Sequence, residues 1–156
     1  MAVSDISNWI LGNRAGWDRV KLKHIFQVQN GSTPRSGEDS YWDGDIVWIT
    51  PSDLGSLTSM TFYDSARKLT DEGFANSGTA MAPTGSIAVS TRAPIGHVAI
   101  GGIEFCTNQG CRSMVPLHYD DSKFFYYHLV AAKPLLQGLG RGSTFVELSS
   151  SNGICV

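Results

Sequence analysis

Short apolar runs, broken at close intervals by glycine and proline, are the feature that most limits what this chain can fold into. The runs are rich in β-branched and aromatic residues and are too short to be buried helices. They lie at Ile46–Ile49, Ile87–Ser90, Val98–Ile100, Glu104–Cys106 and Arg112–Val115. Seventeen glycines in 156 residues favour many turns over long helices. The pattern predicts short strands joined by tight turns in a curved sheet.

Helical spacing is clearest in the last third of the chain. A helix is expected to begin near Asp121 or Ser122, because either side chain can cap it. Its apolar residues recur at intervals of four, three and four, which places them on one face: Phe125, Leu129, Ala132 and Leu136. Pro134 is expected to break or kink this helix. The chain is therefore predicted to be a single α+β domain, with a twisted, mostly antiparallel sheet and several short helices.

Several weaker local signals complete the prediction. Before the middle of the chain we expect a strand passing into a short helix over Val20–Val28, a turn with positive φ at Asn30–Gly31 and an exposed loop over Pro34–Asp43. After the run that ends at Ile49 we expect a helical turn capped by Ser52 or Asp53. A strand over Thr61–Leu69 and a short helix at Thr70–Phe74 are expected to follow. Trp48 is predicted to be a core residue, whereas Tyr41 and Trp42 either stack on a ligand or support the loop before them.

Charge and cysteine content restrict the partners and the compartment. Twelve Lys and Arg against fourteen Asp and Glu give a net charge of −2, which argues against tight, unaided binding to phosphates. Three cysteines form no even disulfide framework, so a reduced, cytoplasmic protein is predicted. No apolar run is long enough for a membrane span, and no export signal is recognisable. We expect no membrane partner.

Two catalytic or metal-dependent alternatives lack the residues they need. Cys106, Cys111, His97 and His118 do not show the paired spacing of a structural zinc site. A Cys–His hydrolase built on Cys106 or Cys111 with His97 has no evident orienting acid, and buried cysteines are usually structural. The sequence predicts no catalytic residue, no metal and no cofactor.

Four phrases of glycine, proline and small hydrogen-bonding residues remain to be explained. They are Asn30–Pro34, Ser90–Gly96, Thr107–Gly110 and Gly140–Phe145. None contains an obvious nucleophile and base, so they indicate recognition and not catalysis.

The order of these phrases carries a family resemblance. The phrase Asn30–Pro34 is followed by Trp48-Ile49-Thr50, by a Pro-x-Gly-Ser-Ile-x-Val-Ser stretch at 83–90, and by Ala93–Gly96, Thr107–Gly110 and Gly142–Phe145. In this order they closely resemble the target recognition domain of type I restriction–modification specificity subunits. The resemblance runs from Trp17 to Leu148. It divides the chain into a lead-in (1–16), a DNA target recognition domain (17–148) and a short tail (149–156).

The resemblance implies a non-enzymatic function. Each such domain reads one half of a split double-stranded DNA target, and separate modification (methyltransferase) and restriction subunits carry out methyl transfer and cleavage. In that family a long helix follows the domain, whereas here only residues 149–156 follow Leu148. The expectation is a single-domain fragment or a shortened subunit.

Candidate DNA contacts, apart from Lys68, lie in or beside the phrases. Arginine side chains suit guanine, Asn and Gln suit adenine, Ser suits either, and Lys and Arg also contact phosphates. The candidates are Arg35, Ser36, Lys68, Arg92, Asn108, Gln109, Arg112, Arg141 and Ser143.

Each candidate has a structural alternative. Asn108 and Gln109 can satisfy neighbouring backbone groups, Arg92 can form an internal salt bridge, and Arg141 can lie in a solvated loop. The rival functional class is a protein-interaction or small-ligand module. A closed apolar pocket with scattered arginines favours that rival, and a basic strip on one face favours DNA.

Overall fold

The computed structural model describes residues 20–118 and 121–139 of the chain. The strands are β1 (Phe26–Asn30), β2 (Trp42–Ile49), β3 (Thr61–Phe62), β4 (Lys68–Leu69), β5 (Ile87–Ser90), β6 (Val98–Gly101), β7 (Cys106–Thr107) and β8 (Cys111–Pro116). The helices are α2 (Pro51–Ser56), α3 (Asp71–Ala75), α4 (Ser122–Ala131) and α5 (Lys133–Leu139), with 3₁₀ turns η1 (Leu22–His24) and η2 (Asp39–Tyr41). The predicted lead-in and tail lie outside the described residues, as do Arg141 and Ser143.

The strands form two sheets. A five-stranded sheet has the order β1-β8-β5-β6-β3, and a three-stranded sheet has the order β4-β2-β7. The pairs β1–β8, β8–β5, β5–β6 and β2–β4 are antiparallel, whereas β3–β6 and β2–β7 are parallel. The predicted α+β class and mostly antiparallel pairing are confirmed, but the strands are divided between two sheets where one was expected.

Alternating side chains give the five-stranded sheet two different faces. Ile87 and Val89 of β5 pack in one core cluster with Phe125 and Leu129 of α4. Ala88, which lies between them, belongs to a second cluster with residues of β2, α2 and the segment before β7: Val47, Ile49, Leu54 and Phe105. The sheet is therefore covered by α4 on one face and by the second sheet and α2 on the other.

Helix α4 begins and ends as its sequence predicts. Asp121 is the N-cap, and its Oδ1 accepts a hydrogen bond from the Phe124 amide at 3.0 Å. The four residues expected on one face are all buried: Phe125, Leu129, Ala132 and Leu136. The helix ends at Ala131, and Pro134 lies in the first turn of α5, where a missing amide hydrogen is tolerated. In the described part of the chain, no helix is long and apolar enough to cross a membrane.

Three local predictions are corrected. Over Val20–Val28 the helical turn η1 precedes strand β1, the reverse of the expected order, because β1 pairs residue by residue with β8. The single strand expected over Thr61–Leu69 is two short strands, β3 and β4, which belong to different sheets.

The cap of α2 is the third correction. Thr50, and not Ser52 or Asp53, caps this helix, with Pro51 at its first position. Asp53 lies at the third helical position and closes a capping box with Thr50. The helical turn itself is confirmed, as is the short helix that follows Thr70.

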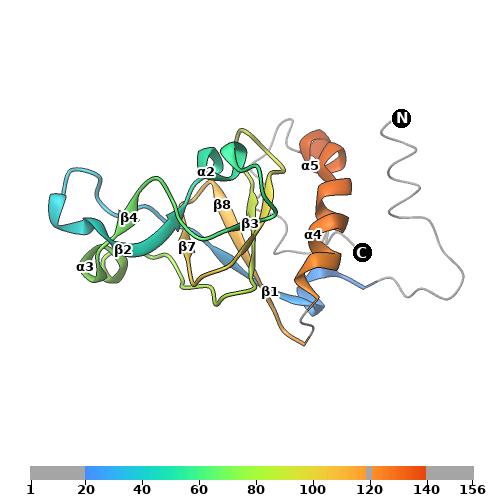
Figure 1. Ribbon diagram of the computed structural model, residues 1–156, viewed down its shortest axis with the longest axis horizontal. Coiled ribbons are helices and arrows are strands. Elements are labelled where there is room, and N and C mark those ends of the chain that lie inside the picture. The colour runs from blue at the N-terminus through green and yellow to red at the C-terminus, as the bar shows by residue number, and fades with distance from the viewer. Residues whose placement is uncertain (1–19, 119–120, 140–156) are drawn as a thin grey trace, which may run out of the picture.

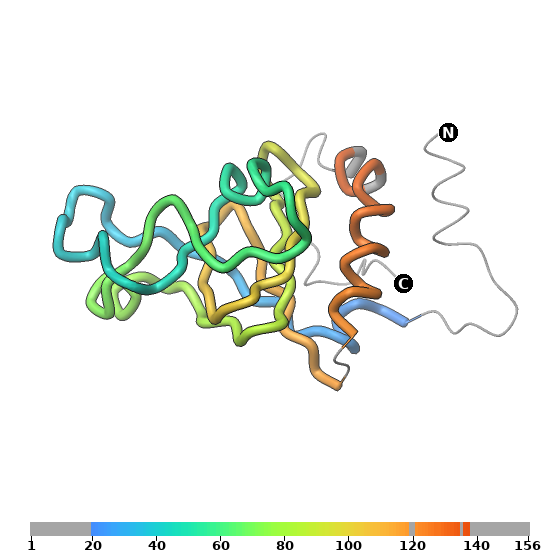
Figure 2. The backbone as a smooth tube through the Cα atoms, viewed as in Figure 1, coloured from blue at the N-terminus to red at the C-terminus, as the bar shows by residue number. Residues whose placement is uncertain are grey.

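The described part of the domain is elongated (Figures 1 and 2). Helix α4 lies toward one end of the long axis, and the blue-to-cyan loop between β1 and β2 extends to the other end, beside α3. The loop is thus separated from the helix that covers the larger sheet.

Candidate nucleic-acid interface

Three of the four phrases meet at one place, which we call the loop junction (Gly31–Thr33, Thr91–Arg92 and Asn108–Gly110). The Ser32 amide donates to the Thr107 carbonyl at 2.9 Å. The Thr91 and Arg92 amides donate to the Gly110 carbonyl at 2.8 and 3.2 Å. Phrases far apart in the sequence are therefore joined by backbone hydrogen bonds, and the fourth phrase lies outside the described residues.

Gly31 is needed at the junction because two backbones approach closely there. A Cβ atom on Gly31 would lie 1.9 Å from the Asn108 carbonyl oxygen. The predicted turn with positive φ is wrong: Asn30 is the last residue of β1, opposite Arg112, and Gly31 is not among the described residues with positive φ. The constraint on Gly31 is steric and comes from a distant part of the chain.

The neighbouring residues Asn108 and Gln109 have different surroundings. Asn108 Oδ1 accepts a hydrogen bond from the Gly110 amide at 2.9 Å, so this side chain shapes the turn. Gln109 is exposed, and its Oε1 accepts from the Thr33 hydroxyl. The junction therefore presents Gln109 at the surface and uses Asn108 as support.

Two arginines lie at the junction, and neither has a carboxylate partner in the part of the chain that the structure describes. Arg112 Nη1 donates to the carbonyls of Gln109 and Cys111, at 3.3 and 3.0 Å. Burial, and next the charge of Arg92, lower the pKa of Arg112, so the two cations are close enough to repel each other. Among the described residues the one ion pair joins Lys68 and Asp64, and neither junction arginine takes part. The internal salt bridge considered for Arg92 is not formed there. An anion at this place relieves the repulsion.

The remaining described candidates lie outside this junction. Arg35 and Ser36 are exposed on the loop between β1 and β2. Lys68 is in β4 of the smaller sheet, where its Nζ lies 3.0 Å from Asp64 Oδ1. Of the basic candidates, Arg92 and Arg112 lie close enough to interact electrostatically, and Arg141 lies outside the described residues.

The loop between β1 and β2 is supported by two buried tryptophans. Trp48 is 5% exposed, which confirms its core position, and its Nε1 donates to the Ser32 carbonyl at 3.0 Å. Trp42 is 6% exposed, and its Nε1 donates to the Arg35 carbonyl at 3.3 Å. Of the two roles considered for Trp42, the structure shows support of the loop.

Arg67 is a residue that sequence reasoning missed. Its guanidinium carbon lies 3.5 Å from the centroid of the Trp42 ring, in a cation–π contact. No local motif marks Arg67, because its partner lies on another strand and the contact depends on the pairing of β2 with β4.

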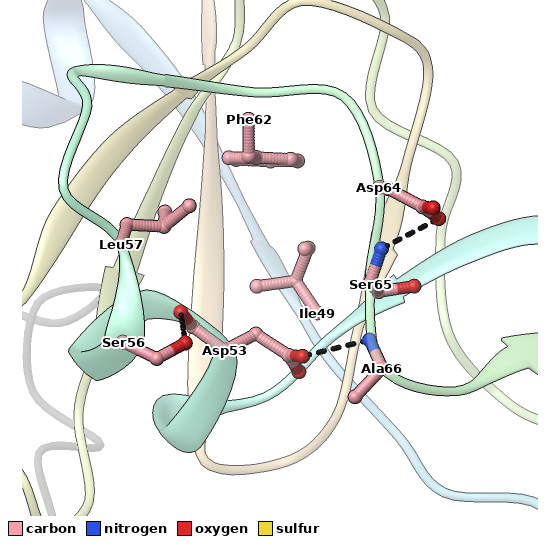
Figure 3. A pocket seen from close by; sticks show the side chains of 8 residues that line it. All are labelled: Ile49, Asp53, Ser56, Leu57, Phe62, Asp64, Ser65 and Ala66. Atoms are coloured by element: carbon pink, nitrogen blue, oxygen red, sulfur yellow. Dashed lines mark hydrogen bonds between the residues drawn. The ribbon is translucent and has the colours of Figure 1, made fainter.

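A cavity of about 320 Å³ lies between α2 and the segment Phe62–Ala66 (Figure 3). Its lining includes the carboxylates of Asp53 and Asp64 but no arginine. Both carboxylates already accept backbone hydrogen bonds: Asp53 from the Ala66 amide at 2.9 Å, and Asp64 from the Ser65 amide at 2.8 Å. The lining combines these carboxylates and two serines with the apolar residues Ile49, Leu57 and Phe62, so it is not the closed, purely apolar pocket that would favour the rival small-ligand module.

The described cysteines are buried thiols. Burial raises the pKa of Cys106 to about 12, and burial followed by the nearby charge of Asp53 raises the pKa of Cys111. His97 differs, because burial and then the charge of Lys133 lower its pKa. In the described ranges, no three His, Cys, Asp or Glu side chains are grouped to hold a metal ion.

We predict that Cys106 and Cys111 resist alkylation while the chain is folded. At pH 8 a thiol with a pKa of about 12 is protonated, and only the thiolate reacts. Unfolding returns both pKa values toward 9.0, so raising the pH beyond about 9 ionises the unfolded thiols first and lowers stability. Mass spectrometry after iodoacetamide treatment, with and without denaturant, measures how far each thiol is alkylated in the unfolded and the folded chain. Equal labelling in both conditions contradicts the burial of these thiols.

The fold and the loop junction define an α+β domain, and comparison with known proteins gives its family. Residues 14–152 match the type I restriction modification DNA specificity domain, and the chain belongs to this family. The resemblance seen in the sequence is confirmed, and with it the prediction of a DNA target recognition domain.

Related specificity subunits come from archaea and bacteria. The chain is 38% identical over 138 residues to the type I restriction enzyme MjaIX specificity subunit of Methanocaldococcus jannaschii, covering 86% of this chain and 32% of that protein. It is 28% identical to the EcoR124I/EcoR124II specificity subunit of Escherichia coli, covering 85% and 31%. The chain therefore spans about a third of the length of these relatives.

Two solved structures share the fold. The HsdS subunit from Thermoanaerobacter tengcongensis superposes with a TM-score of 0.67 at 17% identity, over 98% of this chain and 39% of that one. The type I restriction–modification S subunit from M. genitalium gives 0.63 at 16% identity, over 98% and 37%.

Proposed function

We propose that this domain reads one half of a bipartite double-stranded DNA target and so directs modification and restriction subunits to it. The match of residues 14–152 to a DNA specificity domain is the observation that carries the proposal. The names of the relatives, which are specificity subunits of type I restriction enzymes, support it. The same proposal places the protein in the cytoplasm, with its DNA.

At the junction, the proposal assigns phosphate contacts to Arg92 and Arg112. Both lack a carboxylate partner among the described residues, and arginine side chains are common phosphate contacts. Gln109 is assigned a base contact because its side chain is exposed beside these arginines. Asn108 then acts by holding the turn.

The other candidates are assigned by position. Arg35 and Ser36 belong to the protruding loop, and Lys68 lies in β4 of the smaller sheet, which supports that loop. Arg141 and Ser143 remain proposed contacts on the strength of the Gly140–Phe145 phrase alone.

A selection experiment tests this function. The chain, together with a modification subunit encoded beside it, is incubated with a pool of random duplexes, and the bound DNA is sequenced. We expect enrichment of a short motif at a fixed position. A bound pool with the composition of the input contradicts sequence recognition.

We also predict that the chain alone binds DNA weakly. Its net charge of −2 supplies little electrostatic attraction, so the Kd is expected at or above the non-specific range of about 10⁻⁶–10⁻⁴ M at physiological salt. Fluorescence anisotropy with a labelled duplex measures it. Nanomolar binding without a partner subunit contradicts this dependence on assembly.

A further inference from the structure

The loop between β1 and β2 is exposed but is fixed at both ends. Near its start the Trp48 and Trp42 indoles bind the carbonyls of Ser32 and Arg35. At its end the Thr70 amide donates to the Tyr41 carbonyl at 3.1 Å, and the Thr70 hydroxyl donates to the Ser40 carbonyl at 2.7 Å. A loop held in this way keeps its exposed side chains in a defined arrangement and loses little entropy on binding.

Within the loop, two further backbone hydrogen bonds link Arg35, Glu38 and Tyr41. The Glu38 amide donates to the Arg35 carbonyl at 3.2 Å, and the Tyr41 amide donates to the Glu38 carbonyl at 3.1 Å. The Arg35 carbonyl therefore joins the loop tip to Trp42. Arg67 covers the face of the Trp42 ring at 3.5 Å, and the Arg35 carbonyl accepts from the N–H at the ring edge; we call this arrangement the Arg67–Trp42 clamp.

The exposed side chains of the tip suit bases better than phosphates. Arg35 brings one positive charge, and Glu38 and Asp39 bring two negative charges, so phosphate repels the tip as a whole. In the major groove, arginine pairs with the acceptors of guanine, and a carboxylate accepts from the amino group of cytosine. A G·C pair offers both partners at once. Glu38 is already bonded to the Ser40 hydroxyl at 3.1 Å, which leaves Asp39 as the candidate cytosine reader.

We infer that the tip, Arg35–Ser40, reads G·C base pairs and that Arg67 is a positioning residue that holds it through Trp42. The inference rests on the proposed function, since it specifies which bases one loop of the domain recognises. Arg35 contacts guanine, Asp39 contacts cytosine, and Arg67 contacts neither.

Duplex selection with a modification subunit tests the inference. Four forms of the chain are compared: unchanged, Asp39→Asn, Arg67→Ala and Trp42→Phe. The unchanged chain is expected to select a G·C pair that Asp39→Asn no longer prefers, with a loss of about 5- to 150-fold in discrimination at that position. Arg67→Ala and Trp42→Phe are expected to relax the same position. Trp42→Phe keeps every charge but removes the N–H that holds the Arg35 carbonyl.

Two further measurements separate positioning from direct contact and from misfolding. Hydrogen exchange at the Glu38 and Tyr41 amides is expected to rise about 10-fold or more in Arg67→Ala, while β8 amides stay protected. The salt dependence of DNA binding is expected to stay unchanged in Arg67→Ala, whereas loss of a phosphate contact lowers the slope of log K against log salt by about 0.9.

Each outcome decides one claim. If the unchanged chain selects a motif but the variants select the same motif, the inference is wrong and the proposed function stands. If Arg67→Ala weakens all sequences equally with a lower salt slope, Arg67 contacts phosphate and the clamp is wrong. If the unchanged chain selects nothing, the proposed function fails, and the reading of G·C pairs fails with it.

Discussion

Gly31→Ala is expected to lower the free energy of unfolding by at least about 1–3 kcal/mol. The new Cβ would lie 1.9 Å from the Asn108 carbonyl oxygen and 2.3 Å from the Thr107 hydroxyl. Because the nearer atom belongs to the backbone, the two backbone segments must separate. Separation breaks the hydrogen bond from the Ser32 amide to the Thr107 carbonyl and opens the loop junction. Urea unfolding followed by tryptophan fluorescence measures the effect.

The chain supplies a matched control for this substitution. Gly37 lies in the exposed loop, and a Cβ there has no atom within 4 Å, so Gly37→Ala is expected to change stability by less than about 0.5 kcal/mol. Equal stability of the two variants contradicts a close contact at Gly31. The comparison isolates the steric requirement, since both variants add the same single methyl group.

Removing both junction arginines is expected to have the largest effect on DNA binding. With Arg92→Ala/Arg112→Ala in the assembled complex, the slope of log K against log salt is expected to fall by about 1.8, because each lost phosphate contact contributes about 0.9. Affinity is expected to fall by about 10-fold or more for every sequence, since a hydrogen bond to a charged group contributes on the order of 1.5–3 kcal/mol. Titrations at several salt concentrations measure both quantities.

A double variant with the same loss of charge is the control. Lys21 and Lys23 are exposed beside η1, at the opposite end of β1 from the junction. Lys21→Ala/Lys23→Ala is expected to leave the slope unchanged. An equal fall of the slope in both double variants shows that only net charge matters. A relaxed base preference at a single base pair in the arginine variant shows that an arginine reads a base. Either result contradicts the phosphate assignment.

Local patterns predicted the elements whose causes are local. The helical spacing of Phe125, Leu129 and Ala132 identified the buried face of α4, and Asp121 identified its start. The apolar run ending at Ile49 identified the core of β2. These predictions succeed because the residues that determine each element lie within it.

The predictions that failed depend on contacts between distant segments. Gly31 was interpreted as a turn residue, yet its constraint comes from Asn108 on the far side of the junction. The division into two sheets depends on the parallel pairing of β2 with β7, which no local pattern records. Arg67 was missed for the same reason, since its partner Trp42 becomes its neighbour only in the folded sheet.

Within the candidate site, the phrases identified segments that meet at the loop junction, but they did not predict the role of each residue. Two residues with side-chain amides were considered at the junction. The Asn108 side chain bonds within the turn, whereas the Gln109 side chain is exposed. Among the described basic candidates, Arg92 and Arg112 lie close enough to interact electrostatically, while Lys68 pairs with Asp64. Sequence patterns specify which residue types are present, but exposure and partners are set by packing.

The central claim is that this domain discriminates DNA by sequence, and a specificity ratio tests it most directly. The Kd of the assembled complex is measured for a selected duplex and for the same duplex with its selected base pairs permuted, at about 0.15 M salt. Because both duplexes carry the same phosphates, their electrostatic attraction cancels in the ratio. We predict a ratio of about 10³ or more. A ratio near one at every salt concentration contradicts the account.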